Sequence, residues 1–203
     1  MARQAGIVTI AWLLLTSAAL AQNNHYDVSV TVGPVISKQS SGNGTVLAPT
    51  NSGGLVATGR IRFSERFSLA ANFGRTKNSQ LYSVSPNEYR VQGPITEFGG
   101  AVFFSFLETK KLEVFALGGM SALVFTPKTT VIDGVSSSLP ARTQTKPAPV
   151  YGLGADYHVY HRFAVRLLYR GLFYKAPDFT VPNFFTGAYG HMAEPTVGLV
   201  FKF

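Results

Sequence analysis

Between residues 26 and 203, apolar and polar residues alternate along the chain in eight separate segments. The first of them reads YDVSVTV, with Val28, Val30 and Val32 separated by Ser29 and Thr31. A period of two residues with β-branched and aromatic side chains on the regular face predicts β-strands. The predicted strands are 26–32, 55–63, 67–73, 98–106, 112–120, 151–157, 163–173 and 197–203.

The connections between these predicted strands are alternately short and long. The short ones are 64–66, 107–111 and 158–162, and the long ones are 38–54, 76–91, 126–147 and 175–190. Most connections in globular domains are shorter than about 12 residues, so long connections gathered at one end need a reason. Short periplasmic turns and long extracellular loops are the pattern of an outer-membrane barrel. We therefore predict an all-β chain that forms an eight-stranded antiparallel up-and-down transmembrane β-barrel with four long extracellular loops.

A soluble eight-stranded barrel with an apolar interior, of the lipocalin kind, would show the same alternation. Two features favour the membrane. Aromatic residues such as Phe63, Phe67 and Phe163 gather at the short-turn ends of the strands, as in an interfacial girdle. Charged residues are only 14% of the chain although 46% of it is hydrophobic. That composition fits a lipid-facing band, where one Arg or Lys at the midplane costs about 2–4 kcal/mol.

The N-terminus has the parts of a secretory signal peptide. Arg3 precedes the apolar stretch 6–15, and Ala19 and Ala21 supply the small residues of a cleavage site. A retained anchor is the alternative, but the apolar stretch is short for a spanning helix of about 20 residues. We predict a cleaved signal peptide over 1–21 and a barrel domain over 22–203. The chain has no Cys, which excludes disulfides and thiol chemistry.

The last predicted strand carries a more specific pattern. It ends VGLVFKF, with Phe at the terminus and apolar residues at alternate positions behind it. This segment resembles the C-terminal strand of bacterial outer-membrane barrels, and the whole chain resembles the small OmpA/OmpX-like eight-stranded barrels often called the porin family. The resemblance implies a monomer in the bacterial outer membrane. It also implies that Phe201 and Phe203 form the insertion signal that the barrel-assembly machinery recognises.

Ionisable residues on the mixed face of the strands are candidates for the barrel interior. An eight-stranded barrel is just wide enough for side chains to fill it, and buried charges need partners. The predicted lumen charge network contains Arg60, Arg62, Glu97, Glu113, Asp156, Arg166, Arg170 and Glu194. A structural polar plug is the main expectation, and a narrow gated conduit is the alternative.

Enzymatic chemistry is a second alternative, because two families of eight-stranded outer-membrane barrels modify lipid A. The deacylase-like family uses a His-x-Ser motif, which none of the four histidines has. His191 near Asp178 is only a weak match to the palmitoyltransferase-like family. His158 and His161 have a helical spacing without a third ligand nearby. We therefore expect no catalytic residue, no cofactor and no metal site.

The surplus of positive charge lies largely in and next to the long connections. The net charge is +8, or +7 without Arg3. Nucleic acid is a poor partner for an exported protein, whereas lipopolysaccharide phosphates match a cationic rim. Lys77, Arg90 and Lys146 are the predicted lipopolysaccharide-facing charges. The expected function is that of a non-enzymatic barrel that supports envelope integrity or surface and lipopolysaccharide interaction through its loops.

Overall fold

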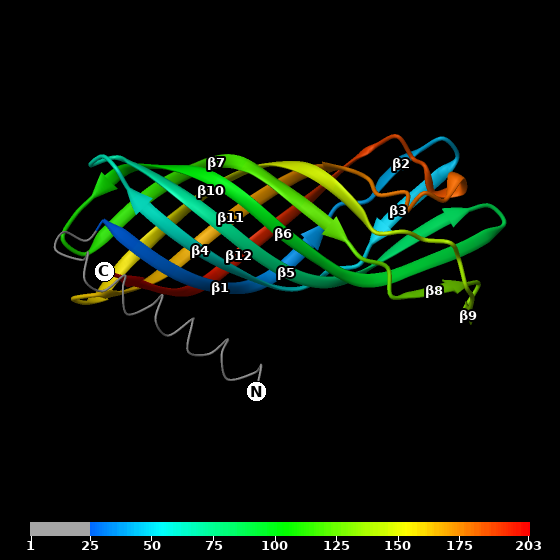
Figure 1. Cartoon of the computed structure of the whole chain (residues 1–203), viewed down its shortest axis with the longest axis horizontal. Coiled ribbons are helices and arrows are strands. Elements are labelled where there is room, and N and C mark those ends of the chain that lie inside the picture. Colours follow the sequence, from blue (N-terminus) through cyan, green and yellow to red (C-terminus); the bar gives the residue numbers. More distant parts are fainter. Residues whose placement is uncertain (1–24) are drawn as a thin grey trace, which may run out of the picture.

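The computed structural model describes residues 25–203, which form a closed barrel of β-strands with an extension at one end (Figure 1). The predicted signal peptide, 1–21, lies outside the described residues. Within residues 25–203, no helix has the length and apolar character needed to cross a membrane.

Eight long strands make the barrel wall, and each pairs antiparallel with the next along the chain. They are β1 (Tyr26–Ser37), β4 (Ser52–Arg62), β5 (Phe67–Val84), β6 (Asn87–Glu108), β7 (Leu112–Phe125), β10 (Gln144–Tyr160), β11 (Phe163–Lys175) and β12 (Tyr189–Lys202). The ring closes where β12 pairs with β1, with Leu199 opposite Val30. The predicted eight-stranded antiparallel barrel is confirmed.

The two ends of the barrel differ in size. At the short-turn end, brief turns join β4 to β5, β6 to β7 and β10 to β11, and the C-terminus lies there too (Figure 1). At the long-loop end lie the additional elements β2 (Ser40–Gly42), β3 (Thr45–Pro49), β8 (Thr129–Ile132), β9 (Val135–Ser136) and the 3-10 helix η1 (Pro182–Phe184). Because β3 pairs with β5 and β8 pairs with β6, the sheet continues beyond the barrel wall.

The second long connection differs from its prediction. The sequence pattern predicts a loop over 76–91, whereas β5 and β6 remain paired as far as Val84 opposite Asn87. Thr76, Asn78 and Gln80 still alternate inward and are buried. Because these inward residues are polar, the hydrophobic period disappears while the strand persists.

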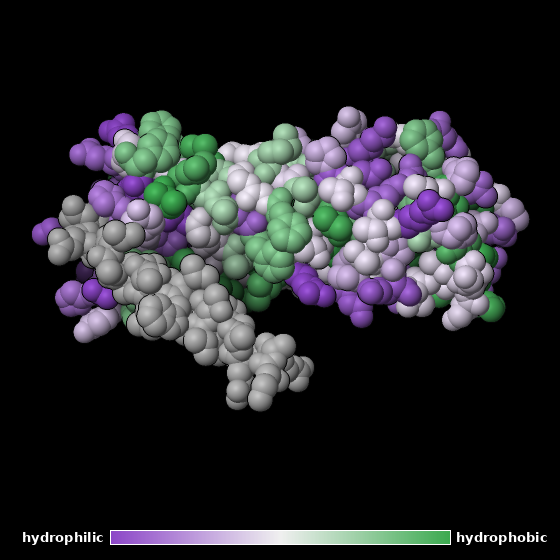
Figure 2. All heavy atoms as spheres, viewed as in Figure 1, coloured by the Kyte–Doolittle hydropathy of each residue, from purple (hydrophilic) through white to green (hydrophobic). Residues whose placement is uncertain are grey.

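The outward side chains are apolar through the middle of the wall. Leu69, Leu153 and Leu199 are 54%, 55% and 65% exposed, although they are large and hydrophobic. On the face drawn in Figure 2, hydrophobic side chains gather over the middle of the barrel, and hydrophilic side chains gather over the long-loop end. Rings pack at the short-turn border of the band, where the centroids of Phe163 and Phe201 are 5.0 Å apart. A water-soluble protein would not expose so continuous an apolar band.

Gly198 marks a point at which β12 lies very close to β1. A Cβ atom at this position would lie 2.0 Å from the Val30 carbonyl oxygen and 2.6 Å from the Thr31 Cα. We expect Gly198→Ala to disturb closure of the barrel, because backbone atoms must move to admit the methyl group. Electrophoresis of unboiled samples in dodecyl sulfate should then show loss of the compact, faster-migrating form.

Gly59→Ala is the matched control for this prediction. Gly59 lies on β4, on the other side of β1, and a Cβ atom there would meet nothing within 4 Å. We expect Gly59→Ala to keep the compact form. If Gly198→Ala keeps the compact, unboiled form as fully as Gly59→Ala does, the close approach of β12 to β1 at Gly198 is contradicted.

Candidate functional site

The lumen holds the candidate site, and its charges fall into two groups. The first group, which we call the lower ion cluster, lies towards the short-turn end. Its ion-paired members are Asp27, Arg60, Arg62, Glu108, Glu113, Asp156, Arg166 and Lys202. Asp156 and Arg166 lie opposite each other on β10 and β11, and the guanidinium group donates to both carboxylate oxygens at 2.7 Å. This bidentate geometry ties the two strands together.

The carboxylate of Glu113 is the centre of the lower ion cluster. Its side chain is fully buried, and it accepts hydrogen bonds from Arg60 Nη1 at 2.9 Å and Arg62 Nη2 at 2.7 Å. Ser105 Oγ and Lys202 Nζ also donate to it, at 2.7 and 3.2 Å. The cluster as a whole has four bases and four acids, so its formal charges cancel. Such balance is what burial of charges demands.

Two phenylalanine rings pack against the guanidinium groups of the lower ion cluster. The Arg60 guanidinium carbon lies 5.4 Å from the Phe103 ring centroid, and that of Arg166 lies 5.2 Å from the Phe115 centroid. The two rings pack together with their centroids 5.0 Å apart. These contacts stabilise the buried guanidinium groups through the electron-rich ring faces.

The second group, the upper ion cluster, consists of Glu97, Arg170 and Glu194. Arg170 Nη2 donates to Glu97 Oε1 at 2.5 Å, and Arg170 Nε lies 3.6 Å from Glu194 Oε2. Ser121 Oγ donates to the same Glu97 oxygen at 2.7 Å. With two acids and one base, this cluster is not balanced in the way that the lower one is.

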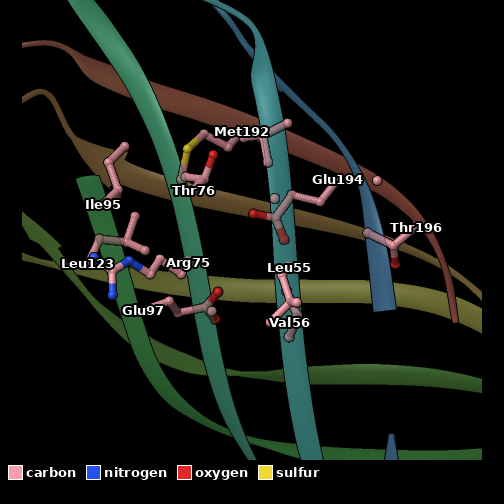
Figure 3. A pocket seen from close by; sticks show the side chains of 14 residues that line it. Leu55, Val56, Arg75, Thr76, Ile95, Glu97, Leu123, Met192, Glu194 and Thr196 are labelled. Atoms are coloured by element: carbon pink, nitrogen blue, oxygen red, sulfur yellow. The ribbon is translucent and has the colours of Figure 1, made fainter. Parts of the chain in front are cut away.

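A small cavity adjoins the upper ion cluster. Gly33, Gly54 and Gly74, on three neighbouring strands, line this cavity, and its volume is about 20 Å³. Figure 3 shows the side chains of Glu97 and Glu194 reaching into this space from different strands. The space is enough for about one water molecule, which limits what the lumen can admit at this level.

Beyond the upper ion cluster the inward face carries no ion pair among the described residues, and aromatic rings close the barrel mouth beside uncharged polar residues such as Asn78 and Gln80. We call this group the aromatic cap: Tyr82, Tyr89, Phe125, Tyr174, Phe179 and Phe184. The rings of Tyr82 and Phe184 stack with centroids 4.2 Å apart, and Tyr82 Oη donates to the Pro177 carbonyl oxygen at 2.7 Å. Charged residues therefore fill the lumen nearer the short-turn end, whereas aromatic rings and uncharged polar residues fill the mouth.

Gln144, at the start of β10, holds the loop that supplies Phe179. Its Oε1 accepts hydrogen bonds from the backbone N–H groups of Asp178 and Phe179 at 3.1 and 3.0 Å. Phe179 and Thr180 both have left-handed backbone, with φ of 51° and 62°. Such a conformation costs roughly 1–2 kcal/mol per residue outside glycine, so the packing of the loop must outweigh this cost.

Asp178 strengthens the same loop through its charge. Partial burial acts to raise the pKa of Asp178, but hydrogen bonds from Gln144 and the Thr180 backbone, with the charge of Lys146, outweigh burial and hold the pKa below its ordinary value. A lowered carboxyl pKa means that the ionised form stabilises the folded loop, and that this contribution is lost as the pH falls through the folded pKa.

The structure places all eight predicted lumen residues on the inward face, in these two clusters. Arg62 is partly exposed at the rim, where it pairs with Glu108. The predicted network does not include Asp27, Glu108 and Lys202. Asp27 and Lys202 lie on the polar faces of the first and last predicted strands, which is a usable signal, whereas Glu108 falls just outside its predicted strand.

The three predicted lipopolysaccharide-facing charges do not share one surface. Lys77 on β5 and Arg90 on β6 are exposed on the outward face. Lys146 instead lies on β10 in register with the inward residues Ala148 and Val150, and it is half-buried. The structure therefore separates Lys146 from the outward charges.

His191 and Asp178, which the sequence pairs as a weak candidate, make separate contacts in the structure. His191 faces outward and lies 3.0 Å from Tyr151 Oη through its Nε2, whereas Asp178 is bonded to Gln144. His158 Nε2 lies 3.1 Å from Lys202 Nζ. Across the part of the chain that the structure describes, no group of three or more His, Cys, Asp or Glu residues could hold a metal ion.

A closed antiparallel barrel with an apolar outer band and internal ion pairs defines a transmembrane β-barrel. The chain belongs to the family described as outer membrane protein beta-barrel domain, whose model matches residues 7–201. Its location is therefore the bacterial outer membrane. In such barrels the short turns face the periplasm and the long loops face outward.

Solved structures with the same fold include two small outer-membrane proteins. Neisserial surface protein A is 14% identical with a TM-score of 0.58, and the match covers 88% of this chain and 97% of that one. OprG from Pseudomonas aeruginosa is 11% identical with a TM-score of 0.54, and the match covers 87% of this chain and 95% of that one. At these identities the likeness shows the fold alone. No curated protein sequence matches this chain.

Glu113 offers a direct test of the lower ion cluster. Glu113→Gln removes the one carboxylate shared by three bases and leaves a buried surplus of positive charge, so we expect it to lower the free energy of unfolding by about 3–5 kcal/mol. Urea unfolding in lipid vesicles, followed by tyrosine fluorescence, measures the change.

Glu108→Gln is the matched control, because Glu108 also pairs with Arg62 but its side chain is 44% exposed. We expect a loss of about 0–1 kcal/mol for this exposed pair. A Glu113→Gln variant as stable as Glu108→Gln would show that the lower ion cluster does not support the barrel.

Proposed function

We propose that this protein is a non-enzymatic outer-membrane barrel that supports the envelope by holding lipopolysaccharide against its outer wall. The observation that carries this proposal is a row of exposed basic residues on the outward face of β5 and β6. Arg75 and Lys77 follow Phe73 at alternate, outward positions of β5, and Arg90 lies on β6 opposite Leu81.

The position of these bases relative to the apolar band supports a lipid partner. Phe73 and Phe98 are exposed, pack edge to face with centroids 5.3 Å apart and end the apolar surface on these two strands. Arg75 is the next outward residue beyond Phe73 on the side of the long loops. Basic side chains just beyond a lipid-facing band lie at the level of anionic headgroups, where each contributes about 1 kcal/mol.

The filling of the lumen supports a function other than transport. The lower ion cluster fills the periplasmic half, the cavity beside the upper ion cluster has room for about one water molecule, and the aromatic cap fills the outer mouth. The separation of His191 from Asp178 gives no support to the alternative of a lipid A enzyme. The function we propose therefore rests on the outer surface.

Export and insertion complete this proposal. We propose that residues 1–21 are removed on export and that Phe201 and Phe203 guide insertion by the barrel-assembly machinery, giving a monomer. Their rings pack edge to face at the C-terminus with centroids 4.8 Å apart, and Phe201 also packs on Phe163. An aromatic end of this kind presents a compact apolar surface for recognition.

Lipopolysaccharide retained through purification tests the function. We expect the double variant Lys77→Gln, Arg90→Gln to retain several-fold less lipopolysaccharide than the unchanged protein, because two outward positive charges on the long-loop side of the apolar band are lost. Quantifying lipid A phosphate per barrel after gentle detergent extraction measures this.

Lys146→Gln serves as the control, since Lys146 lies in inward register and carries no outward charge. It should retain as much lipopolysaccharide as the unchanged protein. Undiminished retention by the double variant, or an equal fall in Lys146→Gln, would refute the proposed outer-wall site.

A further inference from the structure

We propose that the outer mouth of the barrel contains a binding site for a small planar aromatic molecule with an amide-like edge, and that the ring of Phe179 occupies this site in the closed protein. The site is separate from the outward bases on β5 and β6, so it stands or falls independently of lipopolysaccharide binding.

The first observation is a pair of buried polar side chains with unused hydrogen-bonding atoms. Asn78 and Gln80 point inward from β5 and are 6% and 2% exposed. Gln80 Nε2 donates to Asn78 Oδ1 at 2.9 Å, but Asn78 Nδ2 and Gln80 Oε1 have no hydrogen-bond partner among residues 25–203. One free donor and one free acceptor thus lie side by side, and buried polar atoms are rarely left without partners.

The second observation is what surrounds them. Asn78 and Gln80 line a small cavity together with the apolar side chains of Ile95 and Phe125 and with the ring of Phe179. Apolar walls with a few convergent polar groups are the ordinary composition of a small-molecule site. A flat ring suits the walls, and a carboxamide or a similar heteroaromatic edge matches one donor and one acceptor.

The third observation concerns Phe179 itself. Its ring is 2% exposed and lies edge-on to Tyr82 and Phe125, yet it comes from a loop rather than from the barrel wall. The loop keeps the ring in place with left-handed backbone at Phe179 and Thr180 and with the polar contacts of Gln144. Withdrawal of this loop would release the strained backbone and expose the apolar space to a ligand of similar size.

Phe184 is the matched control for Phe179, because it does not line this cavity. It is also fully buried and belongs to the aromatic cap, but it stacks on Tyr82, packs edge to face with Tyr89 and does not line the cavity of Asn78 and Gln80. Loss of either ring therefore leaves a hole of the same size, and only one of the holes lies beside the free donor and acceptor.

The experiment compares 4-fluorobenzamide with 4-fluorotoluene, both followed by fluorine NMR in identical detergent micelles. The proteins are the unchanged barrel, Phe179→Ala and Phe184→Ala, each first shown to migrate as a compact barrel without boiling. We expect Phe179→Ala to bind 4-fluorobenzamide at least tenfold more tightly than Phe184→Ala does, and more tightly than it binds 4-fluorotoluene.

Gln80→Leu in the Phe179→Ala background should remove the preference for the amide and leave binding of 4-fluorotoluene. In the unchanged protein, saturating 4-fluorobenzamide should raise amide hydrogen exchange of Asp178, Phe179 and Thr180, as the ring is displaced. Equal binding of the two probes by Phe179→Ala, or equal behaviour of Phe179→Ala and Phe184→Ala, would show an unspecific hole and overturn the proposal. No change in hydrogen exchange would equally overturn displacement of the ring.

Discussion

In the hydrocarbon core of a membrane, a backbone N–H or C=O group without a partner in the protein has no water to bind. The pairing of β1 with β12 meets this constraint, because it closes the sheet and leaves no edge in the wall. Closure then decides where side chains go. With a period of two, each strand sends one set of residues to lipid and the other into a lumen too narrow for bulk water.

The ion pairs and the aromatic cap occupy different levels of the lumen. Arg60 and Arg166 lie in a neutral network of ion pairs at the periplasmic half, whereas Phe179 and Phe184 help close the outer half with apolar contacts. The upper ion cluster lies between them and carries one more acid than base. The two functions that we propose therefore use the surfaces that this filling leaves available: the outer wall beyond the apolar band and the mouth beneath the loops.

The strands of the wall and the inward charges could be predicted from the sequence, because lipid and lumen impose a regular period on residues such as Leu199 and Arg166. The same period failed over 76–84, where polar residues occupy the inward face of a strand. The aromatic cap could not be predicted, since Phe179 and Phe184 come from a loop without periodicity and reach the mouth only through tertiary packing. Lys146 was assigned outward because its strand begins earlier than the hydrophobic pattern indicates.

The central claim is that the barrel is closed and that its lumen is filled from one end to the other. Conductance of the purified protein in planar lipid bilayers tests this claim most directly. The account predicts that folded, heat-modifiable protein leaves the bilayer without stepwise conductance at either polarity. Steady single-channel steps from the same preparation would contradict it, because ions cannot pass the buried Glu113 network and the aromatic cap as they are arranged here.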